Sequence, residues 1–252
     1  MTDLIKKQLN RTSIRSFKNK KIENDKLELL KKVINASPTS INGQQFSAII
    51  IEDKATKDFI ADHNLNQAWI KTAPLLIVFV ADINRVRIAQ TDMNNIELPI
   101  LDSPEILLVG TADCAIAATN LFNAALSLDL GGCYLGGIRG NADLIAKKLK
   151  LEGQSTPIMA IALGYPDDVN DMKPKVNKIY NNEYCLDTIK TELKAYNVLM
   201  EDYYTKRGEV TKRGPKDWSI NTALTYRKYY KLDYKNELEK QFKITYFKDD
   251  KK

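Results

Sequence analysis

Three polar residues near the start of the chain are spaced to hold an anion. Arg11, Ser13 and Arg15 alternate along the segment RTSIR, so in an extended backbone their side chains project to the same side. Guanidinium groups donate hydrogen bonds in a planar fork that matches phosphate oxygens, and a hydroxyl between two forks completes the set of donors. The other interpretation is a pair of solvated arginines at the end of a helix.

A second cationic pair lies far along the chain, where Lys173 and Lys175 flank Pro174. Proline favours an extended conformation for the residue before it, so both ammonium groups can approach one anion. Lysines beside a proline are also common on protein surfaces. A shared phosphate site therefore requires a fold that brings the two basic segments together.

Neutral hydrogen-bonding side chains precede an apolar run that begins at Phe46. They include Ser37, Thr39, Ser40 and Gln44, and Gln67 follows later in the chain. A carboxamide offers a donor and an acceptor together, which suits the edge of a heterocyclic ring. A polar turn that leads into a strand is the alternative for each residue taken singly.

Glycine pairs flank the short apolar run of the segment GGCYLGG, which includes Tyr134, Gly136 and Gly137. Glycine permits close approach of a ligand or of a second backbone. Neither the dinucleotide fingerprint nor the phosphate-loop motif occurs in the sequence. A flat ring lying against Gly136 and Gly137 and a pair of tight turns remain equal interpretations.

Few residues are available for acid, base or metal chemistry. His63 is the only histidine, which argues against a histidine-based triad, and its default interpretation is a surface residue. Cys114, Cys133 and Cys185 fit neither a zinc spacing nor a disulfide framework and are expected to be reduced and mostly buried. The chemistry is therefore expected from a bound cofactor. A phosphorylated flat ring suggests flavin mononucleotide (FMN) or pyridoxal phosphate, and no local sequence indicates the lysine that the latter needs.

The composition is that of a globular protein, with 252 residues, 44% of them apolar and 28% charged. Residues 201–252 hold 14 basic and 9 acidic side chains, together with seven of the 12 tyrosines. Basic and aromatic residues together can bind nucleic acid. The interspersed carboxylates instead favour a solvated helical extension.

The longest weakly polar stretch covers residues 106–128 and contains Asp113, Asn120 and Asn123. It is long enough to cross a bilayer, but three such side chains inside a span would be costly. We therefore expect a central helix covered by its own domain or by a partner subunit. The first residues lack the apolar core of a signal peptide, so we expect a cytoplasmic protein with no membrane association.

Periodicity predicts helices and strands that alternate irregularly, which favours a mixed sheet wrapped by helices. The predicted helices cover residues 3–9, 25–36, 53–61, 66–71, 106–128, 142–149 and 188–204, and the predicted strands cover 46–51, 75–81, 133–135 and 158–163. Two further segments are predicted as excursions or mobile loops, at 84–104 and 206–217, and residues 219–252 as an appended arm.

Five motifs, in order and over nearly the whole chain, closely resemble the nitroreductase family. They are RTSIRSF at 11–17, ASPTSINGQQF at 36–46, Gln67 ahead of PLLIVFVADINR at 74–85, LGGCYLGGIRG at 130–140 and LGYPDDVNDMKPK at 163–175. The long tail and YYTKRG at 203–208 resemble its NADPH-dependent nitroreductase and FMN reductase branch.

The resemblance implies an α+β fold for residues 1–252 as a single domain, with a mostly antiparallel central sheet flanked by helices. It also implies an interlocked homodimer, with FMN bound non-covalently in each of two interface pockets. The helix at 106–128 would lie in the dimer core, and the arm at 219–252 would pack on the partner subunit.

The resemblance also assigns residues to the cofactor. Those implied to hold the flavin phosphate are Arg11, Ser13, Arg15, Lys173 and Lys175. Those implied to meet the ring are Gln44 and Gln67, with the backbone around Tyr134, Gly136 and Gly137, while Ser37, Thr39 and Ser40 would come from the other subunit. The candidates for the adenosine phosphate of NADPH are Lys206, Arg207, Lys212 and Arg213, with Arg213 the first choice.

The implied function is an FMN-dependent NADPH oxidoreductase with no catalytic side chain of its own and no metal. In such a cycle hydride passes from NADPH to the flavin N5, and the electrons then pass to small-molecule acceptors such as nitroaromatics, quinones, flavins or azo compounds. One alternative keeps the flavin fold with different reductive chemistry, such as dehalogenation or flavin breakdown. The other, nucleic-acid binding by the basic tail, is far less favoured.

Overall fold

The computed structural model describes residues 1–92, 96–169, 171–211 and 214–229. These residues form two compact units, one over residues 1–169 and one over residues 171–229. Each unit is described by itself below. The prediction of one domain over residues 1–252 stays a prediction.

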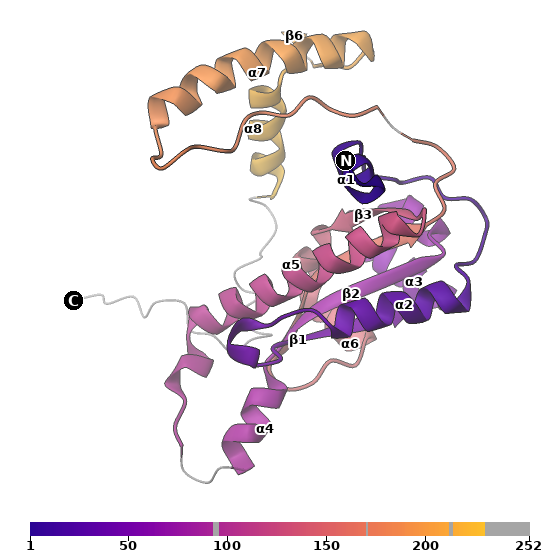
Figure 1. The fold of residues 1–252 in the computed structure, drawn as a ribbon, viewed down its shortest axis with the longest axis vertical. Coiled ribbons are helices and arrows are strands. Elements are labelled where there is room, and N and C mark those ends of the chain that lie inside the picture. Colours follow the sequence, from indigo (N-terminus) through magenta and orange to yellow (C-terminus); the bar gives the residue numbers. More distant parts are fainter. Residues whose placement is uncertain (93–95, 170, 212–213, 230–252) are drawn as a thin grey trace. The chain divides into compact units, whose positions relative to one another are not determined.

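The first unit is built on a four-stranded sheet in which every neighbouring pair is antiparallel (Figure 1). Its strand order is β1-β2-β4-β3, and the strands are β1 (Phe46–Ile51), β2 (Leu75–Asp82), β3 (Gly131–Leu135) and β4 (Ser155–Gly164). All four lie where the apolar runs predicted strands, and the prediction of a mostly antiparallel sheet is confirmed.

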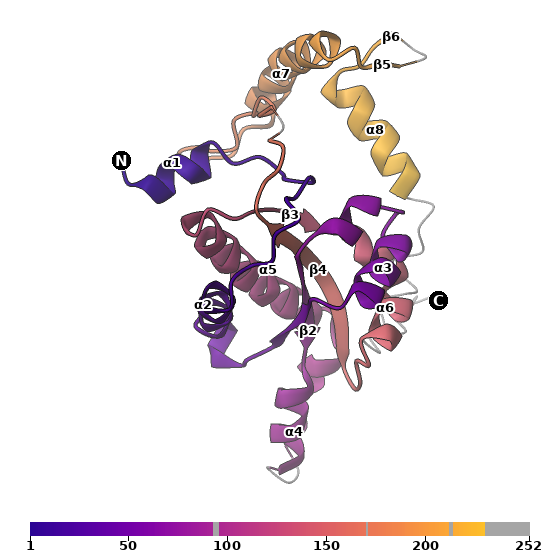
Figure 2. The ribbon, with the colours of Figure 1, turned by 90° about the vertical axis from the view of Figure 1, so that its right-hand side faces the viewer.

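Helices cover both faces of this sheet (Figures 1 and 2). One face carries α2 (Asn24–Asn35) and α5 (Pro104–Ser127), and the other carries α3 (Lys54–His63) and α6 (Ala142–Lys148). The helix α1 (Asp3–Leu9) contacts α5. Short 3₁₀ turns occur at η1 (Ser40–Asn42), η2 (Ala68–Thr72), η3 (Pro99–Asp102) and η4 (Gly137–Asn141).

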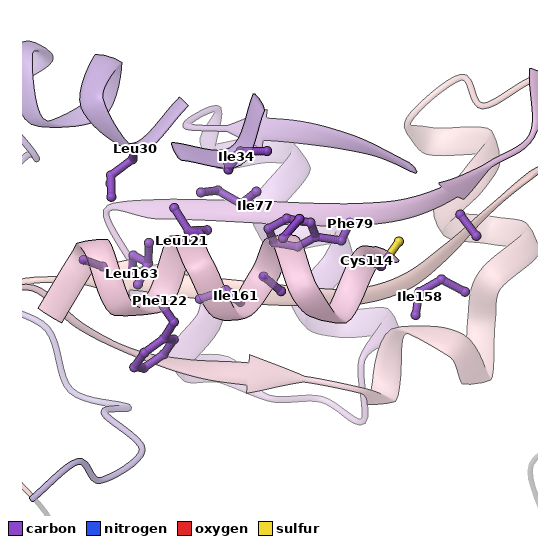
Figure 3. Packing of buried hydrophobic residues seen from close by; sticks show 14 of the residues in the cluster. Leu30, Ile34, Ile77, Phe79, Cys114, Leu121, Phe122, Ile158, Ile161 and Leu163 are labelled. Atoms are coloured by element: carbon purple, nitrogen blue, oxygen red, sulfur yellow. The ribbon is translucent and has the colours of Figure 1, made fainter. Parts of the chain in front are cut away.

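Two hydrophobic clusters follow from the two-residue alternation of β2. Leu75, Ile77 and Phe79 pack with α2 and α5, whereas Leu76 and Val78 pack with the helices on the opposite face. Figure 3 shows the first cluster, in which side chains of α5 and of α2 meet those of β2 and β4. Because both faces are buried, β2 reads as one continuous apolar run in the sequence.

Three of the differences between the elements and their predictions bear on the first unit most. The segment predicted as a helix at 66–71 is the 3₁₀ turn η2. The strand β4 begins at Ser155, three residues before its apolar run. The helix α4 (Asn84–Asp92) lies in a segment predicted only as an excursion, and it extends away from the sheet in both views (Figures 1 and 2).

Within residues 171–211 and 214–229, the second unit has two helices and a pair of short antiparallel strands. They are α7 (Leu186–Lys206), the two-residue strands β5 (Val210–Thr211) and β6 (Gly214–Pro215), and α8 (Trp218–Tyr229). Its core contains the buried side chains of Tyr196, Met200 and Tyr204, with Trp218 packed against them. Tyr196 and Tyr204 thus contribute to a small core, whereas Tyr184 and Tyr226 are exposed. Residues 230–252 of the predicted arm lie outside the described part of the chain.

Candidate functional site

The N-terminal segment, residues 11–18, is fixed to the end of the sheet by its backbone. The Ile14 amide donates to the Gly132 carbonyl oxygen at 2.9 Å, and the Lys18 amide donates to that of Tyr165 at 2.9 Å. The side chains of Ile14 and Phe17 are buried. Backbone hydrogen bonds and two buried apolar side chains therefore hold this segment in place.

The Arg11 side chain lies against an aromatic pair that joins α5 to β3. Its guanidinium carbon lies 5.2 Å from the centre of the Phe122 ring, and Phe122 stacks on Tyr134 at 5.0 Å and 14°. The Nη1 atom of Arg11 is buried and has no hydrogen-bond partner. Burial raises the pKa of the Tyr134 hydroxyl, so this ring is neutral at physiological pH.

A pocket of about 260 Å³ opens beside this stack. It is lined by Arg11, Ile14, Phe122 and Gly131, among others. A buried guanidinium nitrogen without an acceptor lowers the stability of the fold, because its hydrogen bonds to water are lost and no protein hydrogen bond replaces them. The arrangement is suited to an anion that reaches Arg11.

Arg15 and Gln67 belong to neighbouring parts of the first unit. The Arg15 guanidinium is exposed and its carbon lies 5.9 Å from the centre of the Trp69 ring. Trp69 is in η2, two residues after the half-buried Gln67. Ser13 is half-buried and has an interaction partner. Arg15, a predicted phosphate ligand, therefore lies beside η2, the element that follows the predicted ring contact Gln67.

The residues 39–45 form a loop that we call the amide loop, and it contains Thr39, Ser40 and Gln44. The Gln44 amide and side-chain nitrogens both donate to the Thr39 hydroxyl, at 3.2 and 3.4 Å. Gln44, Ile41 and Asn42 have positive φ angles of 55°, 48° and 55°. Three residues other than glycine therefore adopt the left-handed backbone conformation within one short loop, which is unusual.

Ser37, just before the amide loop, is buried and tied to two helices. Its hydroxyl donates to the Val33 carbonyl of α2 at 3.1 Å and accepts from the Asn120 side chain of α5 at 3.1 Å. Its hydroxyl is therefore engaged within the first unit. The predicted role of Ser37, Thr39 and Ser40 toward a second subunit stays a prediction.

Gly137 lies against Asn64, a residue that no motif singles out. A Cβ atom at Gly137 would come within 2.3 Å of the Asn64 Oδ1 atom, so a larger residue cannot fit without displacing it. Asn64 is fully buried, and neither atom of its amide has a hydrogen-bond partner. Leu65 and Asn66 follow with positive φ angles. The sequence offers no signal for Asn64, because its contact with Gly137 joins residues that are 73 positions apart.

The second cationic pair belongs to the second unit. Lys173 has an interaction partner, and its Nζ atom lies 5.6 Å from the centre of the Tyr204 ring, while Lys175 is exposed. Their predicted convergence with Arg11 and Arg15 on one phosphate stays a prediction, because those arginines belong to the first unit.

The candidates for the adenosine phosphate divide into two pairs. Lys206 is ion-paired with Asp202 at 2.7 Å, and Arg207 with Asp171 at 3.0 Å and Glu209 at 3.3 Å. These carboxylates neutralise much of the positive charge that the sequence places there. Lys212 and Arg213 lie outside the described residues.

Comparison with known proteins identifies the fold and its relatives. Residues 9–165 match the model of the nitroreductase family. The chain belongs to the nitroreductase family. It is 32% identical to an FMN reductase [NAD(P)H] of Bacillus subtilis, covering 97% of this chain and 99% of the relative. It is 31% identical to an oxygen-insensitive NADPH nitroreductase of Salmonella typhimurium, covering 84% and 86% of the two chains.

Among solved structures, the chain is similar to B. megaterium NfrA2, with a TM-score of 0.89 and 30% identity over 98% of this chain and 100% of that one. It is also similar to the NADPH:FMN oxidoreductase from Vibrio harveyi, which was solved in complex with NAD+. There the TM-score is 0.75 and the identity 26%, over 94% of this chain and 98% of that one. The resemblance to the nitroreductase family and the α+β fold that it implies are confirmed.

The titratable groups of this nitroreductase-family chain offer no catalytic constellation within the described residues. The His63 ring stacks on Phe59 at 4.1 Å, and its Nδ1 atom is 2.8 Å from the Phe59 carbonyl oxygen, so one ring nitrogen is engaged locally. Cys114 and Cys133 are buried free thiols, as expected, whereas Cys185 is exposed. No group of three or more metal-ligating side chains occurs in the described part of the chain.

Proposed function

We propose that this protein is a flavin-dependent oxidoreductase that takes electrons from NADPH and passes them to small-molecule acceptors. Family membership and the names of its relatives support this function, since they include FMN reductases and NADPH nitroreductases. The observation that carries the proposal on this chain is the buried Nη1 of Arg11, which has no protein acceptor.

The residues around Arg11 fit a phosphorylated aromatic cofactor. The guanidinium supplies charged donors for a phosphate, and a phosphate oxygen would satisfy the unpartnered nitrogen. Arg15 adds a second cation on the same segment, and Ser13 adds a hydroxyl. We propose that Lys173 and Lys175 complete the phosphate site.

The ring contacts that we propose come from the remaining candidates. Gln44 and Gln67 would hydrogen-bond to the edge of the ring, and the backbone of residues 134–137 would lie against it. Ser37, Thr39 and Ser40 would serve the site of the partner subunit. FMN, when bound, supplies the redox chemistry by accepting a hydride and then giving up two electrons.

The tasks left to the protein are binding, orientation and exclusion of water. Arg11 and Arg15 neutralise phosphate charge, and the amides hold the orientation of the ring. The Tyr134 ring, which stacks on Phe122, provides an aromatic neighbour. Solvent can supply the protons for the acceptor, so the proposed function needs no general base. We propose nitroaromatics, quinones, flavins and azo compounds as acceptors.

The donor preference for NADPH would require a cation for its adenosine phosphate. Of the four candidates, we propose Arg213, with Lys212 beside it. Lys206 and Arg207 are weaker candidates because a phosphate would compete with the carboxylates already paired with them.

We propose a homodimer, supported by an exposed apolar stripe on α5. Leu108, Ala112 and Ile116 recur every four residues on the solvent side, and Leu108 is 64% exposed. By length and composition α5 could also cross a membrane, but half of its most apolar window is buried in the first unit. A partner subunit on this stripe would cover it in a water-soluble protein. We propose that this protein is cytoplasmic.

The dimer is tested by Leu108→Glu and sedimentation of the purified protein. Burying a leucine is worth about 1.5–3 kcal/mol, and a two-fold interface holds the residue twice. The dissociation constant should therefore rise roughly 100-fold to 10,000-fold. Leu144→Glu, at an exposed leucine of α6, is the matched control. A wild-type protein that sediments as a monomer at micromolar concentration would refute the dimer.

The proposed activity is tested on the purified protein by its visible spectrum and by NADPH consumption. We expect a yellow protein that oxidises NADPH when a quinone or a nitroaromatic compound is added. A colourless protein that takes up no added FMN would overturn the proposal. A flavoprotein that consumes NADPH without reducing any of these acceptors would point to the alternative reductive chemistry.

A further inference from the structure

The central helix α5 carries polar residues that its apolar surroundings do not explain. Asp113 is 1% exposed and lies between Gly110 and Cys114, which are also buried. A buried carboxylate loses much of its hydration and must be compensated by hydrogen bonds. Its partners therefore indicate what it is for.

Both partners of Asp113 belong to the amide loop. The Ser40 backbone amide donates to its Oδ1 atom at 3.0 Å. Gln45, with its amide nitrogen turned toward the carboxylate, donates to Oδ2 at 2.8 Å and to the Ser40 carbonyl oxygen at 3.3 Å. Gln45 is itself 3% exposed. The Asp113 carboxylate thus links Ser40, near the start of the amide loop, to Gln45 at its end.

The loop is shaped so that this contact can form. A Cβ atom at Gly43 would lie 2.6 Å from the Gln45 side chain, so a glycine is needed for Gln45 to fold beneath the loop. Ile41 and Asn42 adopt positive φ angles, which cost free energy for residues other than glycine. The hydrogen bonds that Asp113 accepts from Ser40 and Gln45 offset this cost.

A second polar residue of α5 holds the chain just before the loop. Asn120 lies two turns after Asp113, on the same side of the helix, and donates to the Ser37 hydroxyl. One helix therefore fixes Ser37 and Ser40, which are both candidates for the flavin site.

We infer that Asp113 is a positioning residue for the flavin site, which sets the conformation of the amide loop through Ser40 and Gln45. The inference rests on the proposed function, since it assumes that Thr39, Ser40 and Gln44 contribute to a bound flavin. Asp113 itself is buried beneath the loop and would act only through these residues. The proposed occupant of the site is FMN, and Gln44 of the loop that Asp113 orders is proposed to meet its ring.

The test compares Asp113→Ala, Asp113→Asn and Cys114→Ala in the full-length protein. Fluorescence titration measures the dissociation constant of FMN, and hydrogen exchange measures the protection of residues 39–45. Losing a charged hydrogen bond should weaken FMN roughly 10-fold to 100-fold in Asp113→Ala. Asp113→Asn keeps an acceptor for the Ser40 amide. Its dissociation constant for FMN should rise only a few-fold, roughly the effect of one neutral hydrogen bond.

Cys114→Ala removes a neighbouring buried side chain that has no bond to the loop. It should lower stability without changing FMN affinity or exchange in the loop, which separates positioning from general destabilisation. If Asp113→Ala folds and binds FMN as tightly as the wild type, or if its loop exchange is unchanged, the inference is wrong. If Asp113→Ala does not fold, the same comparison is made with Gln45→Ala, for which we expect exposed loop amides and weaker FMN. A wild-type protein that does not bind FMN would refute the proposed function instead.

Discussion

Two segments that are proposed to hold one cofactor are themselves held in different ways. Backbone hydrogen bonds from Ile14 and Lys18 attach the N-terminal segment to β3 and to Tyr165, the residue after β4. The amide loop has three residues at positive φ, and Asp113 holds it through one backbone amide and one side chain. Backbone attachment holds the first segment and leaves the Nη1 atom of Arg11 available for a ligand. In the amide loop, the polar side chains are largely used to hold the loop itself.

This difference predicts opposite responses to mutation. In the N-terminal segment, removing a proposed phosphate ligand such as Arg11 should affect ligand binding and leave the fold intact. In the amide loop, the same kind of change should alter the loop first and the ligand as a consequence. The variant with the largest expected effect, in the N-terminal segment, tests whether ligand binding and folding respond separately.

Arg11→Ala should weaken FMN binding without unfolding the protein. A charged hydrogen bond to a phosphate is worth about 1.5–3 kcal/mol, which corresponds to roughly a 10-fold to 100-fold higher dissociation constant. The buried Nη1 has no protein partner, so the change removes the contact with Phe122 from the apoprotein but no hydrogen bond of Nη1. FMN titration and thermal melting of the apoprotein measure the two effects. Lys18→Ala, at an exposed cation of the same segment, is the control.

Unchanged FMN affinity in Arg11→Ala would remove this residue from the phosphate site. A fall in apoprotein stability comparable to the loss of FMN affinity would contradict the proposed independence of side chain and fold. Arg15→Ala should act in the same direction but less strongly, since Arg15 is exposed.

Gly131→Ala should act on the attachment of the N-terminal segment. A Cβ atom there would come within 2.7 Å of Ile14 Cγ1 and 2.8 Å of Pro166 Cγ. Overpacking of this kind costs about 1–3 kcal/mol of unfolding free energy. Urea denaturation measures this loss. The double variant Gly131→Ala/Ile14→Ala should be more stable than the sum of the single effects predicts, and strict additivity would contradict the steric explanation.

The fold was largely predictable from the sequence because burial leaves a periodic pattern. The strands of residues 46–51 and 75–81 and the long helix around residues 106–128 follow directly from apolar runs and their spacing. The helix α4 escaped prediction because its face is not strongly apolar. It is held by polar contacts, such as those from Arg87 to Gln154 and to the Leu101 carbonyl oxygen.

The candidate site was predictable only in part. Arg11 and the amide loop stand out because unusual polar residues lie next to apolar strands. Asp113 was visible only as a polar interruption in an apolar helix, and Asn64 not at all. Their partners, Ser40 and Gly137, are 73 residues away in each case, so the contacts arise from the fold and leave no local pattern.

Ile41→Gly should stabilise the protein, although it removes an apolar side chain. Ile41 has a φ angle of 48° and is 92% exposed, so its side chain packs on little within the subunit. Relief of the left-handed strain, less the entropy that glycine loses on folding, should add about 0.5–1 kcal/mol of stability. Urea denaturation of the apoprotein measures the change.

Ile88→Gly is the matched control for Ile41→Gly. Ile88 is 60% exposed in the right-handed helix α4, where glycine should lower stability by about 0.5 kcal/mol. A loss of stability in both variants would show that the amide loop carries no strain. It would thereby remove one of the two differences between the loop and the N-terminal segment.

The smallest expected effect concerns Glu23, which fixes the strand end to which the N-terminal segment is attached. Its carboxylate is ion-paired with Lys20 at 2.8 Å and accepts a short hydrogen bond from the Tyr165 hydroxyl. The backbone carbonyl of the same Tyr165 accepts from the Lys18 amide. The bonds from Lys20 and then Tyr165 lower the pKa of Glu23 from 4.5 to about 2.

A carboxyl group whose pKa is lowered by folding stabilises the folded state above its ordinary pKa. That contribution is lost as the pH falls through the folded value. Glu23→Gln should therefore be less stable than the wild type at pH 7, and the difference should shrink between about pH 4.5 and pH 2. Thermal melting across this range measures it, and Glu28→Gln on α2 controls for the loss of one acidic charge. Because the bonds of Glu23 lead to the N-terminal segment and not to residues 39–45, hydrogen exchange should increase at Lys18 and stay constant in the amide loop. Equal changes in both segments would mean that they are held as one unit, and the distinction between backbone and side-chain attachment would then have no consequence for stability.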